Sequence, residues 1–263
     1  HVVRCFEDGD ITHVEGKIDP IADIETIETE LMLADLDSLE KRIVNIEKKA
    51  KQGDKESKEL ADLMNRALVL LRDGKPARLV ERSAEEEKAF RGLGLLSSKP
   101  VLYVCNVEEA SADKGNEFSA RVFKRAAEEN AVAVVVSAKI ESEIAVMALA
   151  DQKDFLDAVG LEEPGLNRVI RAGYDLLHLV TYFTVGPKEA RAWTITKGTK
   201  GPAAAGVIHT DFEKGYIRAE TIAYDDYVAN SGEAGAREAG KFRLEGKDYV
   251  VKDGDVMHFR FNT

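Results

Sequence analysis

The sequence at 101–105 reads Val101-Leu102-Tyr103-Val104-Cys105, an unbroken apolar run of the kind that forms a strand covered on both faces. A polar loop and a helical stretch at 116–130 follow, and a second apolar run occupies 131–136. Strand, helix and strand within about 35 residues predict a right-handed parallel unit, because parallel strands need a long crossover between them. The sequence therefore predicts an α/β fold built on a parallel sheet.

A third strand-like run, Val2 to Phe6, opens the sequence and leads into an acidic loop, Glu7 to Asp10. The first residue is His1 rather than Met, and the opening residues resemble the middle or end of a strand. We therefore expect a chain whose N-terminal neighbours are missing, and a first strand that is short of sheet partners.

A helical region begins at Asp19-Pro20, since proline is favoured in the first turn of a helix. Apolar residues then recur four and three apart, as in the seam of a coiled coil, at Met32, Leu36, Leu39, Ile43, Ile46 and Ala50. The break at Gln52-Gly53-Asp54 separates this seam from a second stripe of Leu60, Leu63, Ala67 and Leu70. Two such helices predict an antiparallel hairpin, which is either a scaffold or a docking arm.

Further helices are expected at 140–149, 153–158 and 166–177, and the pattern changes at Val180. Short β-rich pieces then alternate with glycine-rich turns, at 181–185, 190–195, 216–223, 249–251 and 256–261, with one helix at 203–208. This pattern predicts a small separate α+β domain.

Composition limits the possible classes of protein. The chain has 263 residues, of which 44% are hydrophobic, enough for about two domains. No apolar run approaches the roughly 20 residues of a membrane helix, so a cytosolic protein without membrane partners is expected. From Val180 onward twelve basic residues balance twelve acidic ones, so the first 179 residues carry the whole net charge of −11. An acidic body repels phosphates, which disfavours broad contact with nucleic acid and argues against DNA binding.

The two cysteines, Cys5 and Cys105, are too few for a disulfide scaffold. Each lies in an apolar run, so both are expected to be small core residues. A redox-sensing pair is the alternative if the two strands are neighbours. The histidines are scattered without metal-ligand spacing, and no metal site or catalytic residue is assigned.

Two loops follow the predicted strands where ligands bind in sheets of this type, outside the carboxyl ends. They read Asn106-Val107-Glu108-Glu109 and Ser137-Ala138-Lys139. The spacing is that of the base-reading loops in P-loop GTPases, which normally carry Asn-Lys-x-Asp. Val107 in place of Lys and Glu109 in place of Asp weaken a preference for guanine and leave adenine open. The alternative is that the glutamates are solvated loop carboxylates.

Longer motifs accompany these loops in both parts of the chain. The first part contains Arg4-Cys5-Phe6-Glu7-Asp8, Ile11-Thr12-His13-Val14-Glu15-Gly16, Asp19-Pro20, Thr29-Glu30-Leu31 and Leu33-Ala34-Asp35-Leu36. The second contains Phe183-Thr184-Val185-Gly186-Pro187, Ala190-Arg191-Ala192-Trp193-Thr194-Ile195, Lys197-Gly198-Thr199-Lys200, His209-Thr210-Asp211-Phe212-Glu213-Lys214-Gly215 and Asp253-Gly254-Asp255-Val256-Met257-His258-Phe259-Arg260-Phe261. With the two loops, these motifs resemble the YchF family of Obg-like P-loop NTPases over essentially the whole chain.

The resemblance implies a G domain interrupted by a coiled-coil insertion and followed by a β-grasp (ubiquitin-like) TGS domain. On this chain it implies G-domain remainders at 1–19 and 95–179, the insertion at 20–94 and the TGS domain at 180–263. It also implies hydrolysis of ATP in preference to GTP with magnesium, and association with the ribosome in the cytoplasm. The base-contacting positions carried over are Asn106, Val107, Glu109, Ser137, Ala138 and Lys139.

One departure from the family pattern bears on activity. The sequence contains no G-x-x-x-x-G-K-[ST] motif, which cradles the phosphates and supplies a magnesium ligand. We expect the P-loop and switch segments to precede His1. This chain alone is therefore expected to bind ATP poorly and not to hydrolyse it.

Two hypotheses about function remain open. The first is an ATPase whose base site, helical arm and TGS domain lie on this chain. The second is a module that docks on ribosomal RNA, with the nucleotide site only regulating docking. The candidate RNA contacts are Arg191, Lys197, Lys200, Lys214 and Arg218, interleaved with Trp193, Phe212 and Tyr216. The alternative for these aromatic residues is the core of a small domain.

Overall fold

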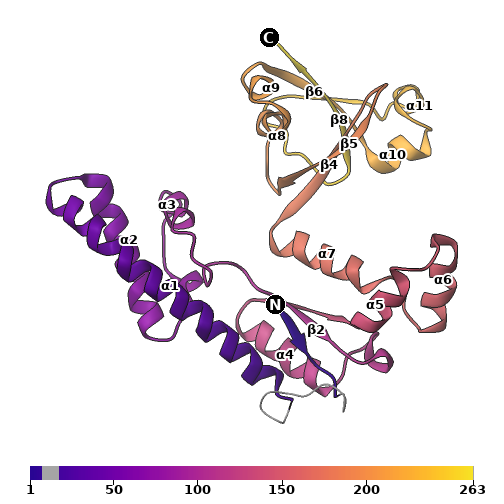
Figure 1. Cartoon of the computed structure of the whole chain (residues 1–263). Coiled ribbons are helices and arrows are strands. Elements are labelled where there is room, and N and C mark those ends of the chain that lie inside the picture. Colours follow the sequence, from indigo (N-terminus) through magenta and orange to yellow (C-terminus); the bar gives the residue numbers. More distant parts are fainter. Residues whose placement is uncertain (8–17, 263) are drawn as a thin grey trace. The chain divides into compact units, whose positions relative to one another are not determined.

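The computed structural model describes residues 1–7 and 18–262, and these divide into two compact units, His1–Ala172 and Gly173–Thr263 (Figure 1). Each unit is described by itself. Part of the acidic loop after Glu7, the Ile11-to-Gly16 motif and His13 lie outside the described residues. No helix in the described part is both long and apolar enough to cross a membrane.

The first unit contains the predicted parallel sheet. Its strands are β1 (Val2–Arg4), β2 (Leu102–Asn106) and β3 (Val132–Val136), in the order β1-β2-β3. Both pairings are parallel, and Cys105 lies between Val3 and Val135 in the register. The first strand ends two residues earlier than expected and, among the described residues, it pairs with β2 only.

The crossover helix α4 (Glu117–Glu128) joins β2 to β3, as the sequence predicts. It begins at a capping box, in which the Asn116 side chain accepts from the Ser119 N–H (3.0 Å) and the Ser119 hydroxyl accepts from the Asn116 N–H (2.8 Å). Its buried face, Val122 and Ala126, packs on the sheet core with Tyr103.

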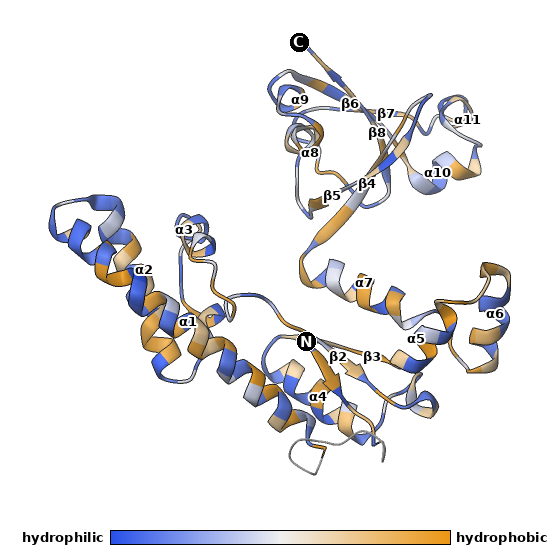
Figure 2. Ribbon diagram, in the orientation of Figure 1, coloured by the Kyte–Doolittle hydropathy of each residue, from blue (hydrophilic) through white to orange (hydrophobic). Residues whose placement is uncertain are grey.

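The two long helices are α1 (Pro20–Lys51) and α2 (Lys55–Arg72), which form the expected hairpin, hereafter the arm (Figure 1). Asp19 caps α1 by accepting from the Ile21 N–H at 3.1 Å. Figure 2 shows hydrophilic and hydrophobic residues alternating along both helices. Leu39, Ile43 and the predicted stripe residues Leu63 and Ala67 are buried between them. Gly53 makes the turn with φ of 95°, a conformation that favours glycine.

A returning segment closes the arm through η1 (Ala77–Leu79) and α3 (Glu87–Gly92). It is fixed to α1 by Asp35, whose side chain accepts from the Leu96 N–H (2.7 Å), the Ser97 N–H (2.7 Å) and the Ser97 hydroxyl (2.6 Å). Asp35 is only 3% exposed. These bonds join residues about 60 positions apart in the sequence, so one carboxylate connects the arm to the start of β2.

The base of the arm is joined to α4 by a network of ion pairs. Arg78 of η1 lies 3.0 Å from Glu28 of α1 and 3.5 Å from Glu129, and Arg125 of α4 lies 3.1 Å from Glu28. The Tyr103 hydroxyl donates to Glu129 at 3.0 Å. Burial and the nearby carboxylates raise the pKa of Tyr103. Four elements therefore meet at partly buried charges, which orient the arm on the sheet.

The three helices predicted after β3 are present with shifted bounds, as α5 (Ala138–Ile144), α6 (Leu149–Ala158) and α7 (Gly165–Leu176), which runs into the second unit. The short helix η2 (Glu109–Ser111) was not predicted. α5 begins two residues earlier than expected, directly after Ser137. The Ser-Ala-Lys loop is thus the first turn of a helix.

The second unit is a mixed five-stranded sheet with short helices. Its strands are β4 (Leu179–Val185), β5 (Ala190–Thr196), β6 (Tyr216–Ala223), β7 (Arg243–Glu245) and β8 (Asp255–Phe261), in the order β5-β4-β8-β6-β7. Only the β4–β8 pairing is parallel. The helices are α8 (Gly201–Ile208), α9 (Thr210–Lys214), α10 (Tyr224–Ala229) and α11 (Glu233–Glu238).

The predicted strand at 249–251 is wrong. Residues there form only an isolated bridge between Lys200 and Val250, and the strand of this region is β7 instead. Val251 is 3% exposed and the Tyr249 hydroxyl donates to Asp255 at 2.7 Å. The apolar residues therefore reflect a buried loop. The three helices α9, α10 and α11 are also absent from the sequence prediction, because each is too short to show a helical period.

We expect Asp35→Ala to destabilise the first unit by about 3 kcal/mol or more, because it leaves buried donors without an acceptor. Asp37→Ala is the matched control, since Asp37 is exposed and pairs only with Lys41, and it should change stability by less than about 0.5 kcal/mol. Urea unfolding followed by circular dichroism measures both. Equal effects would show that the buried carboxylate does not hold the returning segment.

Cys5 directly follows β1 and Cys105 lies in the neighbouring strand β2, and both thiols are free and fully buried. The hydrogen bond with Cys105 and burial raise the pKa of the Cys5 thiol. We therefore expect both thiols to react with Ellman's reagent at least about 100-fold more slowly in the native protein than in urea, since reaction requires local opening. Rapid reaction of the native protein would favour a redox-sensing pair.

Candidate functional site

The carboxyl ends of the parallel strands meet at one edge of the sheet. Asn106 at the end of β2 is the register partner of Val136 at the end of β3, and Arg4 at the end of β1 is its partner on the other side. The Val107 N–H donates to the Val136 carbonyl at 2.9 Å, which extends the pairing into the loops. Residues 5–7, 107–109 and 137–139 therefore leave the sheet side by side.

Asn106 ties the second loop to the third. Its Oδ1 accepts from the Ala138 N–H at 2.9 Å. Because only the amide oxygen can accept, this bond fixes the orientation of the side chain. The Nδ2 group has no hydrogen-bond partner in the described part of the chain, so it remains available as a donor.

Glu109 and Lys139 form an ion pair across the same two loops. Lys139 Nζ lies 2.7 Å from Glu109 Oε1, with side chains 69% and 46% exposed. The hydrogen bond and the charge of Glu109 raise the pKa of Lys139. A ligand that uses the Glu109 carboxylate must therefore share it with Lys139 or displace the lysine.

The Glu108 carboxylate is not available to a ligand, because other side chains already bind it. Asn116 Nδ2 donates to Glu108 at 2.9 Å and to the Cys5 carbonyl at 2.6 Å, and the Ser111 hydroxyl also donates to Glu108. Burial raises the pKa of Glu108, but these hydrogen bonds outweigh burial and hold the pKa below its usual range. Glu108 thus braces the loop to β1 and α4 and is not a free carboxylate.

A cavity of about 340 Å³ lies over these loops. All six predicted base-contacting residues line it, and Glu108, Phe6 and Glu7 complete the lining. Val107 only lines the cavity wall and offers little surface to a ligand, because its side chain is 3% exposed and packs in the sheet core. The sequence reasoning missed Phe6 and Glu7. They could have been found from the predicted strand at 2–6, because the carboxyl end of a third parallel strand lies at the same edge of the sheet as the other two.

The Ser137 hydroxyl marks the floor of this site. Ser137 is 2% exposed, and its Oγ is buried without a hydrogen-bond partner in the structure. A buried hydroxyl without a partner is costly, and such groups concentrate at sites that receive a ligand or a water. The site thus presents an unpaired hydroxyl, an amide donor and a carboxylate–ammonium pair.

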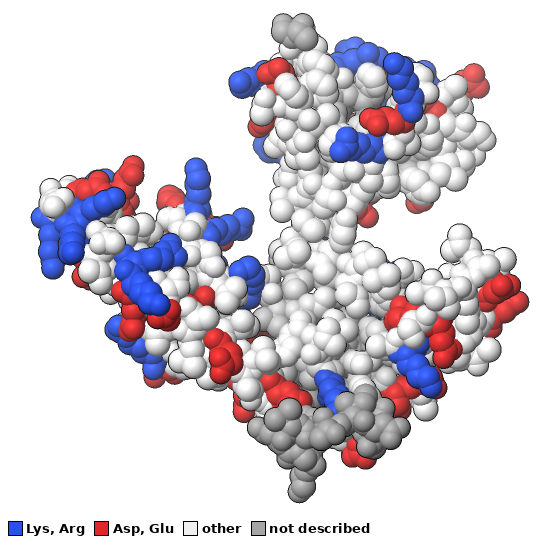
Figure 3. All heavy atoms as spheres, in the orientation of Figure 1, with Lys and Arg blue, Asp and Glu red and all other residues white. Residues whose placement is uncertain are grey.

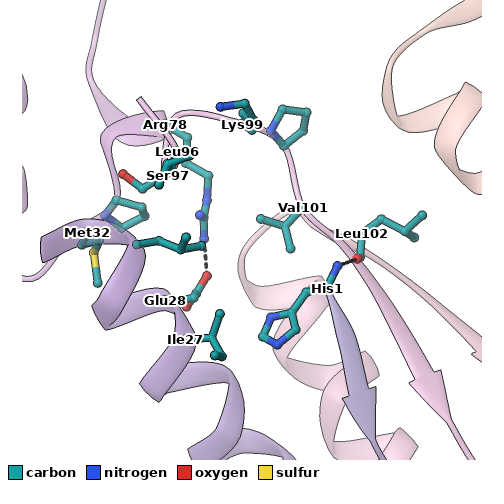
Figure 4. Close-up of a pocket in the computed structure, with 13 residues that line it drawn as sticks. His1, Ile27, Glu28, Met32, Arg78, Leu96, Ser97, Lys99, Val101 and Leu102 are labelled. Atoms are coloured by element: carbon teal, nitrogen blue, oxygen red, sulfur yellow. Dashed lines mark hydrogen bonds and ion pairs between the residues drawn. The ribbon is translucent and has the colours of Figure 1, made fainter. Parts of the chain in front are cut away.

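A second cavity, also of about 340 Å³, lies at the opposite edge, beside the amino ends of β1 and β2 (Figure 4). Its wall carries apolar side chains such as Ile27 and Met32, and Glu28 and Arg78 face each other across it. Ligands of parallel sheets bind at the carboxyl ends, and the charged groups here already pair with each other. This cavity therefore belongs to the base of the arm.

The five basic residues proposed for RNA contact lie on separate elements of the second unit. Arg191 of β5 stacks over Trp193 at 4.2 Å, and Lys200 pairs with Asp248 at 2.8 Å. The other three, Lys197, Lys214 and Arg218, are exposed on the turn after β5, on α9 and on β6. Trp193 and Phe212 pack against the domain core, and Tyr216 is buried in it. Tyr216 is therefore a core residue, whereas Trp193 and Phe212 pack on the core and remain partly exposed.

The fold and the site define an α/β protein whose candidate ligand site lies at the carboxyl ends of a parallel sheet, on Asn-x-x-Glu and Ser-Ala-Lys loops. The family model YchF-GTPase_C, described as a protein of unknown function (DUF933), matches residues 179–262. Over all 263 residues the chain is 56% identical to the "Ribosome-binding ATPase YchF" of Haemophilus ducreyi, of which it spans 72%. The protein of the same name from Bacillus subtilis is 54% identical, again over 72% of its length.

Comparison with solved structures also finds a YchF protein. The Schizosaccharomyces pombe YchF GTPase superimposes with a TM-score of 0.81 at 33% sequence identity, covering 98% of this chain and 71% of the yeast chain. The chain belongs to the YchF family.

We expect Asn106→Leu to loosen the first turn of α5, because it removes the acceptor that the Ala138 N–H has among the described residues. Amide hydrogen exchange at Ala138 should become about 10-fold faster, the equivalent of one lost hydrogen bond. Exchange at Val122 in α4 is the internal control and should not change. Unchanged exchange at Ala138 would mean that the two loops hold each other by other contacts.

Proposed function

We propose that the cavity at the carboxyl edge of the sheet is the base-binding part of a nucleotide site in an ATPase, with adenine preferred to guanine. The observation that carries the proposal is the Asn106–Ala138 hydrogen bond, which presents the free Nδ2 donor beside the Glu109–Lys139 pair and the unpaired Ser137 hydroxyl. Phe6 supplies an aromatic ring in the cavity lining.

The charge pattern supports adenine over guanine. Guanine offers two adjacent donors, its ring N–H and exocyclic amine, which a free carboxylate accepts together. Glu109 already accepts from Lys139 on one oxygen, so it is not free to receive both donors. Adenine offers a single amine donor beside a ring acceptor, which a carboxylate and an ammonium group satisfy together.

The phosphates of a nucleotide need a second set of contacts, beyond those that bind the base. No G-x-x-x-x-G-K-[ST] motif occurs in the 263 residues, so this chain has no loop of that type to hold phosphates. Among the described residues, no group of three or more His, Cys, Asp or Glu side chains could hold a metal, and we assign no magnesium ligand. We propose that hydrolysis of ATP or GTP with magnesium belongs to a protein that also supplies a P-loop, and that this chain alone binds ATP weakly and does not hydrolyse it.

The proposal extends to the domains. We infer G-domain remainders at 1–19 and 95–179, a coiled-coil insertion at 20–94 and a β-grasp TGS domain from 180 to 263. The buried seam of the arm supports the coiled coil, and the mixed five-stranded sheet with α8 packed on its core supports the β-grasp domain.

Association with the ribosome is proposed because two relatives at 54% and 56% identity are named ribosome-binding ATPases. A cytoplasmic location follows from that association. The second candidate function is a docking module, with the nucleotide site only regulating binding to ribosomal RNA. Exposed basic side chains on the second unit, including Lys197, Lys214 and Arg218, favour it.

The test is calorimetric titration of ATP and GTP, with magnesium, into this chain and into a form extended at its N-terminus by the part of the Bacillus subtilis relative that this chain does not match. The extended form should bind ATP more tightly than GTP, and this chain should bind both weakly. In the extended form, Asn106→Asp should retain the acceptor for Ala138, and hence stability, but lose the Nδ2 donor and weaken ATP binding about 10-fold.

Glu109→Asp should narrow the preference for ATP, because the shorter carboxylate draws away from Lys139 and becomes free for guanine. Lys114→Gln is the control, because Lys114 lies outside the cavity and its substitution should leave the preference for ATP unchanged. Equal ATP affinity of the short and extended forms would show that the nucleotide binds at another site. An unaltered affinity in Asn106→Asp would show that the amide does not contact the base.

A further inference from the structure

The far end of the arm carries a cluster of basic side chains on an otherwise acidic protein. Residues 48–58, at the turn between α1 and α2, contain five lysines against one Asp and one Glu. The chain as a whole has a net charge of −11, so the remainder is more acidic still. Figure 3 shows Lys and Arg side chains gathered over this end of the arm. The tip lysines are Lys48, Lys49, Lys51, Lys55 and Lys58.

The tip lysines are free to meet a partner. All five are exposed. In the part of the chain that the structure describes, only Lys55 forms an ion pair, at 3.8 Å from Glu59, and its side chain is 89% exposed. The turn at Gly53 brings the last turn of α1 against the first turns of α2, so all five lysines lie at the same end of the arm.

Helix stability does not account for all of them. Lysines in the last turn of α1 are favourable there, because the carboxyl end of a helix is partly negative. Lys55 and Lys58 lie in the first turns of α2, where the helix end is partly positive and added cations are unfavourable. A local conflict of this kind indicates a functional constraint.

We propose that the tip lysines bind the phosphate backbone of RNA. This inference rests on the proposed association with the ribosome and names the surface that makes the contact. Lysine binds phosphate oxygens as a compact point charge, and it is depleted in protein–protein interfaces. No aromatic residue occurs at 41–58, so the contact reads charge and shape rather than bases.

Geometry keeps the cluster away from the repulsive acidic body. Lys48 lies 20 residues along α1 from Glu28, the anchor at the base of the arm, which is about 30 Å at 1.5 Å per residue. That separation exceeds the Debye length of about 8 Å at physiological salt. An RNA strand at the tip therefore feels the local positive charge and little of the negative charge of the sheet.

A lipid surface fits the tip less well. Helices that bind membranes carry an exposed apolar face that inserts between headgroups. At the tip the apolar seam packs between the two helices, with Ile43 buried and Ile46 packed against it. Val44 is exposed beside them, but no large apolar side chain occurs at 48–58.

The experiment compares three proteins by fluorescence anisotropy with a labelled 16-base-pair RNA duplex of mixed sequence, from 50 to 200 mM KCl. The tip variant carries Lys51→Gln, Lys55→Gln and Lys58→Gln. The control variant carries Lys88→Gln, Lys124→Gln and Lys153→Gln, which remove the same charge from exposed positions elsewhere in the first unit. Thermal melts should be unchanged for both, since Gln has nearly the helix propensity of Lys.

The tip variant should bind RNA at least about 10-fold more weakly at 100 mM KCl. The slope of log K against log salt concentration should also become less steep by about three, since each phosphate contact contributes about one to that slope. The control should match the unaltered chain. Equal affinity and slope in the tip and control variants would overturn the proposal.

Two further measurements identify the partner. Loss of ribosome co-sedimentation in the tip variant with unchanged RNA affinity would overturn the proposal in favour of a protein partner. Binding of the unaltered chain to phosphatidylserine vesicles, lost in the tip variant without a change in RNA affinity, would overturn it in favour of a membrane. Failure of the unaltered chain to co-sediment with ribosomes would contradict the proposed association, whereas the duplex titration tests the tip alone.

Discussion

Parallel pairing of β1, β2 and β3 is the constraint on which the rest of the first unit depends. Because Arg4, Asn106 and Val136 are register partners, three chain segments far apart in sequence leave the sheet at the same point. A shift of one residue in β2 would turn Tyr103 and Cys105 out of the core and carry Asn106 away from the Ala138 N–H. The register therefore fixes the core and the site together.

Two polar side chains, the half-buried Asn116 and the buried Asp35, connect this register to the rest of the unit. Asn116 bonds to the Cys5 carbonyl and to Glu108, which joins the ends of two strands to the start of α4. Asp35 fixes the arm in the same way, because its carboxylate accepts hydrogen bonds from the backbone N–H groups of Leu96 and Ser97, just before β2. Apolar packing at these points would be less directional, whereas a satisfied hydrogen bond selects one arrangement.

The sequence predicts what depends on local pattern and misses what depends on distant contacts. The apolar runs of β2 and β3 and the stripe of α1 are regular enough to be recognised, and both loops of the candidate site follow from the ends of the two strands. Phe6 was missed because only pairing of β1 with β2 brings it to the cavity. The 249–251 strand was predicted wrongly because burial of Val251 in a loop gives the same apolar signal as a strand. The Glu109–Lys139 pair joins residues 30 positions apart, and no periodicity reveals it.

The distribution of charge explains why the arm is long. Glu109 at the carboxyl edge of the sheet and the carboxylates at the base of the arm belong to an acidic body, which repels the phosphate backbone of RNA at long range. A short hairpin would leave Lys55 and Lys58 within the screening distance of those carboxylates, where their attraction for phosphate would be cancelled. The 32 residues of α1 separate the tip lysines from these carboxylates, and the partly buried ion pairs of Glu28 with Arg78 and Arg125 fix the direction of the arm at its base. The same chain can therefore present an acidic surface around its sheet and a cationic one at the tip of the arm.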